Sequence, residues 1–128
     1  VAALALVSTG ARLRVHPAIF RALEAGNDPL RPGEPWSKAD VPVASAMADW
    51  IAANAFDRLG QPLDVRAPTL VVSGDADMLT PSRNAKYLVE HIAGAELFVV
   101  PGGMHTVPHD EPDVVAAAVK GLAARASV

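Results

Sequence analysis

One segment decides the fold of this chain: Ala67-Pro68-Thr69-Leu70-Val71-Val72-Ser73-Gly74-Asp75-Ala76-Asp77. Residues 69–73 form a short apolar, β-branched run between Pro68 and Gly74, and this pattern predicts a strand buried on both faces. Strands of this kind belong to parallel sheets, whose ligands bind just beyond the carboxyl ends of the strands. We therefore expect Asp77 to lie at the carboxyl edge of a parallel sheet.

The flanking sequence predicts two further strands, at residues 1–8 and 96–100. Before the second of these, Thr80 is expected to be the N-cap of a helix that has Pro81 at its first position. A last helix is expected to begin near residues 111–112. Strands and helices that alternate with short links form right-handed parallel βαβ units. The predicted fold class is therefore α/β, with three parallel strands and flanking helices.

The stretch between the first two predicted strands is rich in proline and glycine and keeps only two helical patterns. Pro17 suits the first turn of one helix, which Gly26 would end, and apolar residues of 43–54 recur at helical spacing. This texture predicts a helical cap inserted into the sheet domain. The predicted parts are a core of residues 1–10 and 63–128 and a cap of residues 11–62.

The large apolar side chains of the predicted cap have two interpretations. They line an apolar substrate pocket, or they hold the helices of the cap to the core. These residues are Trp36, Met47, Trp50, Ile51 and Phe56.

The composition excludes several classes of function. The 128 residues are 51% hydrophobic and 20% charged, as in an ordinary globular domain. A net charge of -3 provides no basic surface for nucleic acid or an anionic membrane. The chain has no cysteine, which excludes disulfides and thiolate zinc sites and fits a cytoplasmic location. No apolar run approaches the ~20 residues of a membrane-spanning helix.

Asp77 and His105 are the candidate catalytic residues. His105 follows the third predicted strand and the pair Gly102-Gly103, which we expect to be a flexible link that lets the imidazole point over the sheet edge. An acid and a histidine at the ends of successive parallel strands are two of the three groups of a hydrolytic triad. Asp75 is the alternative acid, although its position directly after the strand also suits a hydrogen bond within the turn.

The segments around these residues resemble the α/β-hydrolase fold superfamily. The acid-bearing segment of that superfamily is an apolar strand followed by Gly-x-x-Asp and a proline, and its histidine is followed by an acid and a proline. A further apolar strand precedes the cap. The matching segments here are residues 68–77 with Thr80-Pro81, residues 99–105 with Asp110 and Pro112, and residues 4–10.

The resemblance implies the C-terminal part of an α/β-hydrolase, with Asp77 as the triad acid and His105 as the general base. It implies cleavage of an ester, lactone or similar acyl bond in a small apolar substrate, through an acyl-serine and without a cofactor. A homo-oligomer stays open. Met104 departs from the family pattern, in which a glycine often precedes the histidine, and is expected to crowd the pocket.

The nucleophile implied by the resemblance is a serine in a Gly-x-Ser-x-Gly turn that precedes these segments. The serines of the chain are Ser8, Ser37, Ser45, Ser73, Ser82 and Ser127, and none stands between such glycines. Because the chain begins with Val1 inside an apolar run, we expect a longer protein and no activity from these 128 residues alone. Two alternatives stay open: a binding module without a nucleophile, and a dehalogenase or epoxide hydrolase with an aspartate nucleophile.

The remaining histidines receive structural interpretations. His105, His109 and Asp110 stand close in sequence, as in some metal sites. Pro108 is expected to disrupt the helix that would align them, so neither a metal nor another cofactor is predicted. His16 is expected to begin a helix.

Overall fold

The computed structural model describes residues 2–31, 33–37 and 41–126. Its internal contacts divide the chain into two compact units. One unit comprises Val1–Arg12 and Asp57–Val128, and the other comprises Leu13–Phe56. The second unit lies inside the stretch interpreted as a cap, and its function as a cap stays a prediction.

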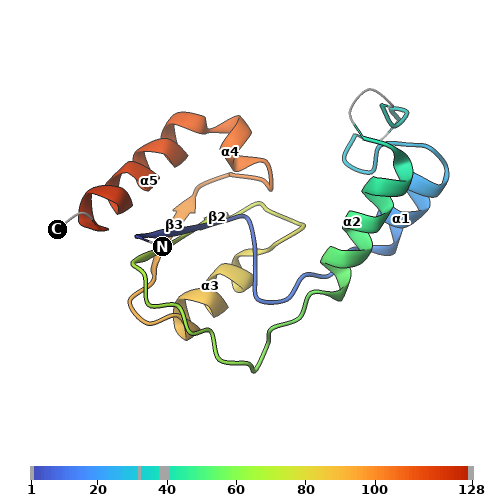
Figure 1. Cartoon of the computed structure of the whole chain (residues 1–128). Coiled ribbons are helices and arrows are strands. Elements are labelled where there is room, and N and C mark those ends of the chain that lie inside the picture. Colours follow the sequence, from blue (N-terminus) through green and yellow to red (C-terminus); the bar gives the residue numbers. More distant parts are fainter. Residues whose placement is uncertain (1, 32, 38–40, 127–128) are drawn as a thin grey trace. The chain divides into compact units, whose positions relative to one another are not determined.

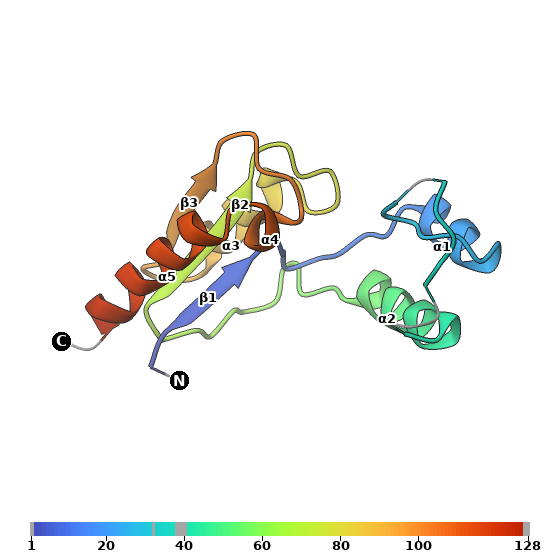
Figure 2. The same ribbon diagram turned by 90° about the horizontal axis from the view of Figure 1, so that it is seen from above.

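The first unit is built on a sheet of three parallel strands (Figures 1 and 2). They are β1 (Leu4–Val7), β2 (Thr69–Gly74) and β3 (Glu96–Val100), in the order β1-β2-β3. All six residues of the central strand are buried, and it has a neighbouring strand on each side. The predicted α/β fold with three parallel strands is confirmed.

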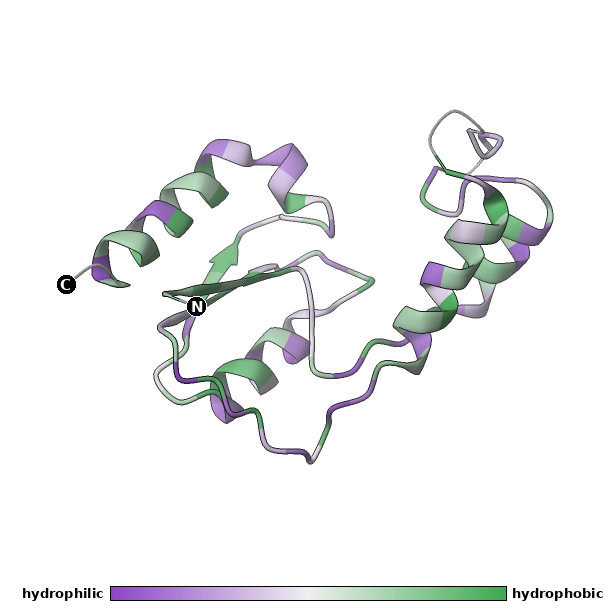
Figure 3. Ribbon diagram, in the orientation of Figure 1, coloured by the Kyte–Doolittle hydropathy of each residue, from purple (hydrophilic) through white to green (hydrophobic). Residues whose placement is uncertain are grey.

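Helices cover both faces of the sheet, as Figure 1 shows for α3 (Ser82–His91) on one side and α5 (Pro112–Ala126) on the other. Successive side chains of a strand point to opposite faces. Leu70 and Val72 accordingly pack in one cluster with Leu122 of α5, while Val71 packs in another with Leu88 of α3. Figure 3 shows the apolar colouring of the strands between these helices. Each such side chain contributes about 1.5–3 kcal/mol when fully buried.

One predicted helix boundary is wrong. The helix α3 begins at Ser82, and its N-cap is Pro81, which makes no side-chain cap hydrogen bond. The predicted cap Thr80 instead donates its hydroxyl to Asp77. Pro108 lies in the first turn of a short helix, α4 (Val107–Asp110), which begins after His105, so no helix aligns His105 with His109. A proline is tolerated there because the first N–H groups of a helix have no partner within the helix.

The second unit pairs the helices α1 (Pro17–Glu24) and α2 (Val43–Ala55). His16 is the N-cap of α1, as predicted, and its Nδ1 accepts a hydrogen bond of 3.2 Å from the N–H of Ala18. Gly26 follows α1 with a φ of 74°, a left-handed conformation typical of glycine at helix ends. The unit buries Ile19, Leu23 and Ala46.

The two interpretations of the apolar side chains of this unit are not resolved by its own packing. Ile51 and Phe56 are 56% and 43% exposed, and Trp36 donates its indole N–H to the carbonyl of Val41. Their contact with a substrate stays a prediction.

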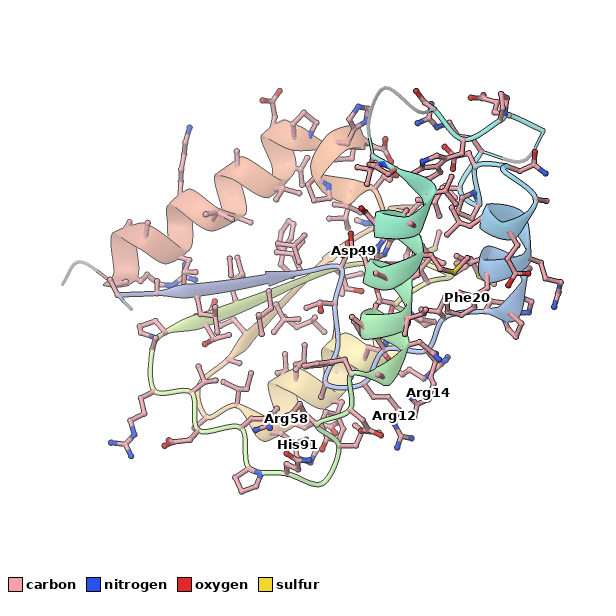
Figure 4. The ribbon with its side chains drawn as sticks, turned by 45° about the vertical axis from the view of Figure 1, so that its right-hand side comes forward. Arg12, Arg14, Phe20, Asp49, Arg58 and His91 are labelled. Carbon is pink, nitrogen blue, oxygen red and sulfur yellow. The ribbon has the colours of Figure 1, made fainter. Side chains whose placement is uncertain are left out.

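Arg12, which is labelled in Figure 4, and Asp57 mark the places where the chain leaves and re-enters the first unit. They form an isolated antiparallel bridge, and Nε of Arg12 lies 2.7 Å from Oδ2 of Asp57. The two crossings of the chain are therefore joined by backbone and side-chain contacts. Among the described residues, no helix combines the length and the hydropathy needed to cross a membrane.

Candidate active site

Asp77 lies in the turn that follows β2, and its side chain is fully buried. Its Oδ1 accepts hydrogen bonds of 2.8 Å from the backbone N–H groups of Leu79 and Thr80. Its Oδ2 lies 2.7 Å from Oγ1 of Thr80 and 3.0 Å from Nδ1 of His105. An aspartate that bonds backbone groups two and three residues ahead forms its own turn. The short segment 77–80 therefore places this carboxylate, and both of its oxygens have partners.

The hydrogen bonds to Asp77 change the acidity of its carboxyl group. Burial by itself raises the pKa of Asp77, but bonds from the backbone N–H and hydroxyl of Thr80, and from His105, outweigh the burial. The pKa of Asp77 is therefore below its ordinary value, and the carboxylate is ionised at neutral pH.

His105 lies in the segment between β3 and α4, with a side chain that is 36% exposed. Its Nδ1 faces Oδ2 of Asp77 at 3.0 Å, so the structure brings together the two predicted site residues. An ionised carboxylate can only accept hydrogen bonds, so the neutral imidazole carries its proton on Nδ1. The lone pair of Nε2 is then available to take a proton from another group.

The turn after β2 and the loop after β3 cross backbone to backbone at Gly74 and Gly103. The N–H of Ala76 donates to the carbonyl of Gly103 at 3.0 Å. A Cβ added at Gly74 would lie 2.1 Å from that carbonyl oxygen, and one at Gly103 would lie 2.7 Å from Cγ2 of Val107. Only residues without a Cβ allow this approach. The predicted flexible link is thus wrong for Gly103, which is buried and serves close packing, whereas Gly102 uses a φ of 69°.

Asp75, the alternative acid, has a different position. Its Oδ1 accepts a hydrogen bond of 2.6 Å from the N–H of Gly102, and the residue is exposed. The carboxylate of Asp75 thus connects the turn after β2 to the loop that carries His105. Of the two aspartates, the structure places Asp77 against the imidazole.

Two exposed methionines are the chain neighbours of the pair: Met78 follows Asp77, and Met104 precedes His105. Met78 is 85% exposed and Met104 is 59% exposed. Since Met104 points to solvent in the described structure, its predicted crowding of a pocket stays a prediction.

The segment after His105 holds a separate polar group. Asp110 accepts a hydrogen bond from the hydroxyl of Thr106 and lies 3.2 Å from Nδ1 of His109. The bond from Thr106 and then the contact with His109 hold the pKa of Asp110 below its ordinary value. Across the described ranges, no cluster of three or more His, Cys, Asp or Glu side chains has the arrangement to hold a metal ion.

Ser8 is the serine at the carboxyl end of β1, and it has a φ of 47°. Its Oγ is buried and has no hydrogen-bond partner among the described residues. A hydroxyl hidden in this way is not presented to a substrate. The pair of Asp77 and His105 therefore has no nucleophile in the described part of the chain that matches the predicted motif.

Thr80 is a further residue of the site, and its pattern in the sequence predicts a different role. A threonine before Pro81 has the pattern of a helix N-cap, which is the role that the sequence predicts for Thr80. A second feature of the sequence points to the observed contact with Asp77. This feature is the spacing of three residues between Asp77 and Thr80, which suits a hydrogen bond between their side chains.

An aspartate after one parallel strand and a histidine after the next stand in the chain order that the last two triad members have in α/β-hydrolases. A model of the family "Serine hydrolase (FSH1)" matches residues 8–117. The chain therefore belongs to the FSH1 serine hydrolase family.

Individual relatives agree with this family. The chain is 41% identical over 51 residues to the proline iminopeptidase PfmaB of Pestalotiopsis fici, which covers 40% of this chain and 18% of that protein. It is 40% identical over 74 residues to the serine hydrolase BPHL of Mus musculus, which covers 51% of this chain and 25% of that protein. A thermophilic esterase aligns with a TM-score of 0.78 and 29% identity, over 97% of this chain and 56% of its own. The chain thus spans about half the length of this esterase and matches shorter parts of the two curated relatives.

Proposed function

We propose that this chain supplies the acid and the general base of a serine hydrolase that cleaves an ester, lactone or similar acyl bond in a small apolar substrate. The observation that carries the proposal is the contact of 3.0 Å between a buried carboxylate of Asp77 and a partly exposed imidazole of His105. The names of the serine hydrolase BPHL and of the thermophilic esterase support the reaction class.

The proposed nucleophile is a serine in a Gly-x-Ser-x-Gly turn of the full-length protein, outside these 128 residues. The chain lacks the motif, and it covers 56% of the esterase. On this proposal the 128 residues alone do not hydrolyse esters.

The proposed reaction begins when Nε2 of His105 takes the proton of the serine hydroxyl and the serine oxygen attacks the acyl carbonyl carbon. The tetrahedral intermediate collapses when the imidazolium gives its proton to the leaving oxygen, and an acyl-serine remains. Nε2 then takes a proton from water, whose oxygen attacks the acyl carbon to form a second tetrahedral intermediate. This intermediate collapses when the imidazolium returns that proton to the serine oxygen, which releases the acid and the free serine. Asp77 holds the Nδ1–H tautomer and stabilises the imidazolium in both halves of the cycle.

The test uses the full-length protein, a fluorophosphonate probe and a short-chain p-nitrophenyl ester. We expect His105→Ala and Asp77→Asn each to lower kcat by about 10⁴-fold, because the first removes the base and the second favours the wrong tautomer. His109→Ala is the matched control, since its side chain is 91% exposed, and it is expected to leave kcat unchanged.

Near-normal hydrolysis by His105→Ala would overturn the proposed role of the pair. Labelling of no serine by the probe, together with no ester hydrolysis by the wild-type protein, would overturn the proposed reaction and return the choice to a binding module or an aspartate nucleophile.

A further inference from the structure

A third side chain touches both members of the Asp77–His105 pair. Oγ1 of Thr80 lies 2.7 Å from Oδ2 of Asp77 and 3.2 Å from Nδ1 of His105. Since Oδ2 is also 3.0 Å from Nδ1, the three atoms form a closed triangle of hydrogen-bonding distances. The pair is therefore a group of three side chains in the folded protein.

The backbone of Thr80 holds the same carboxylate. Its N–H donates to Oδ1 of Asp77 at 2.8 Å, while its hydroxyl reaches Oδ2. One residue thus contacts both carboxylate oxygens, which fixes the plane of the carboxylate as well as its position. Thr80 is 7% exposed, and a β-branched side chain has few χ1 rotamers. Its hydroxyl is therefore held in a narrow range of positions.

The hydroxyl of Thr80 has one proton, which decides the direction of the hydrogen bonds in the triangle. An ionised carboxylate is a stronger acceptor than a neutral imidazole nitrogen, so the hydroxyl of Thr80 donates to Asp77. The lone pairs of Oγ1 are then turned toward Nδ1 of His105. Nδ1 faces two acceptor oxygens, and a single N–H can be shared between two such acceptors.

We propose that Thr80 is a positioning residue of the hydrolase, which orients the carboxylate of Asp77 and holds His105 in the Nδ1–H tautomer. This inference rests on the proposed function for its effect on turnover. Its effect on the imidazole is independent of turnover, because the triangle is made only of residues of this chain.

The first test measures ester hydrolysis by the full-length protein with Thr80→Val, which keeps the shape of the side chain and removes the hydroxyl. We expect kcat to fall about 10- to 100-fold with KM nearly unchanged, because a misplaced catalytic group slows the chemical step more than it weakens binding. Thr80→Ser retains the hydroxyl and is expected to restore kcat to within about threefold of the wild type.

Thr69→Val is the matched control. Thr69 lies at the start of β2, is 2% exposed, and donates its hydroxyl to the carbonyl of Ala67 at 2.8 Å. The variant loses a buried threonine hydroxyl at the start of β2, the end of the strand that lies away from the turn of Asp77, and is expected to leave kcat within about twofold. Thr80→Ala serves as the second variant if Thr80→Val does not fold.

The second test records ¹⁵N and ¹H NMR signals of the His105 ring in the same full-length proteins. We expect the wild type and Thr80→Ser to show one Nδ1–H tautomer with a strongly hydrogen-bonded proton. In Thr80→Val that proton signal is expected to shift upfield and the Nε2–H tautomer to increase.

The outcomes separate the two proposals. Unchanged kcat and unchanged ring signals in Thr80→Val would overturn the role of Thr80, as would a loss in Thr80→Ser equal to that in Thr80→Val. A wild-type protein without any hydrolase activity would overturn the proposed function, while the ring signals would still decide whether Thr80 positions His105.

Discussion

The turn that carries Asp77 and the loop that carries His105 are held in opposite ways. The carboxylate of Asp77 bonds to Leu79 and Thr80, which are two and three residues away in the chain. The loop that carries His105 is held by Gly74, the last residue of β2, and by Asp75, which follows it. The acid is therefore placed by local sequence, and the histidine is placed by tertiary contacts. A change at the crossing of the two segments should accordingly disturb the histidine more than the acid.

The crossing itself gives the largest expected effect. In Gly74→Ala the new Cβ would lie 2.1 Å from the carbonyl oxygen of Gly103, so the two backbones must separate. We expect a loss of about 3 kcal/mol in the free energy of unfolding, together with loss of ester hydrolysis. Urea unfolding of the full-length protein measures the first effect.

Gly121→Ala is the control for this substitution. Gly121 lies within α5, and a Cβ there would meet the side chain of Arg125 at 3.5 Å, an ordinary contact. The variant is expected to gain about 0.5–1 kcal/mol, because alanine favours a helix over glycine. A Gly74→Ala protein as stable as the wild type would contradict the close crossing.

Unfolding at acid pH tests how the turn after β2 holds the carboxylate of Asp77. The folded protein lowers the pKa of Asp77, so the ionised carboxylate stabilises the fold above its unfolded pKa of about 3.9. That contribution is lost as the pH falls through the lower, folded pKa. Urea unfolding from pH 6 to pH 2 should show the wild-type advantage over Asp77→Asn shrinking in this acid range. Parallel curves for the two proteins would show that Asp77 does not titrate differently on folding.

Asp75→Ala is expected to disturb the loop that carries His105 and to leave the turn of Asp77 unchanged. The substitution removes the acceptor of the hydrogen bond of 2.6 Å from Gly102 and leaves the bonds of Asp77 in place. We expect a loss of about 1 kcal/mol in the free energy of unfolding and a fall of about tenfold in kcat. Steady-state kinetics beside Asp77→Asn provide the measurement. A loss in Asp75→Ala as large as that in Asp77→Asn would reverse the roles of the two aspartates.

The smallest effect is expected at the outer end of the histidine loop. Asp110 matches the family pattern, but its partners are the exposed side chains of Thr106 and His109. Asp110→Asn should leave kcat within about twofold, because exposed polar pairs contribute little. A tenfold fall in kcat would add Asp110 to the residues that position His105.

Much of the fold could be predicted from short-range patterns. The strand β3 was predicted with the bounds that it has, because the apolar run 96–100 ends at Pro101 and Gly102. The predictions that the structure contradicts concern residues whose tertiary contacts replace a role that the local sequence favours. The sequence around Thr80 predicts a helix N-cap, but its hydroxyl donates to the carboxylate of Asp77. The pair that contains Gly103 predicts a flexible link, but the backbone of Gly103 packs closely against Gly74.

The amino-acid sequence by itself determined the order of strands and helices and the position of Asp77 and His105 after successive strands. Chain order and the period of the apolar residues are local properties, and they suffice to predict a parallel sheet with an acid and a histidine at one edge. Only the tertiary structure decided that Oδ2 of Asp77 lies 3.0 Å from Nδ1 of His105, and that Thr80 completes the triangle. Those contacts join segments far apart in the chain, and they depend on a backbone crossing that no local pattern of residues specifies.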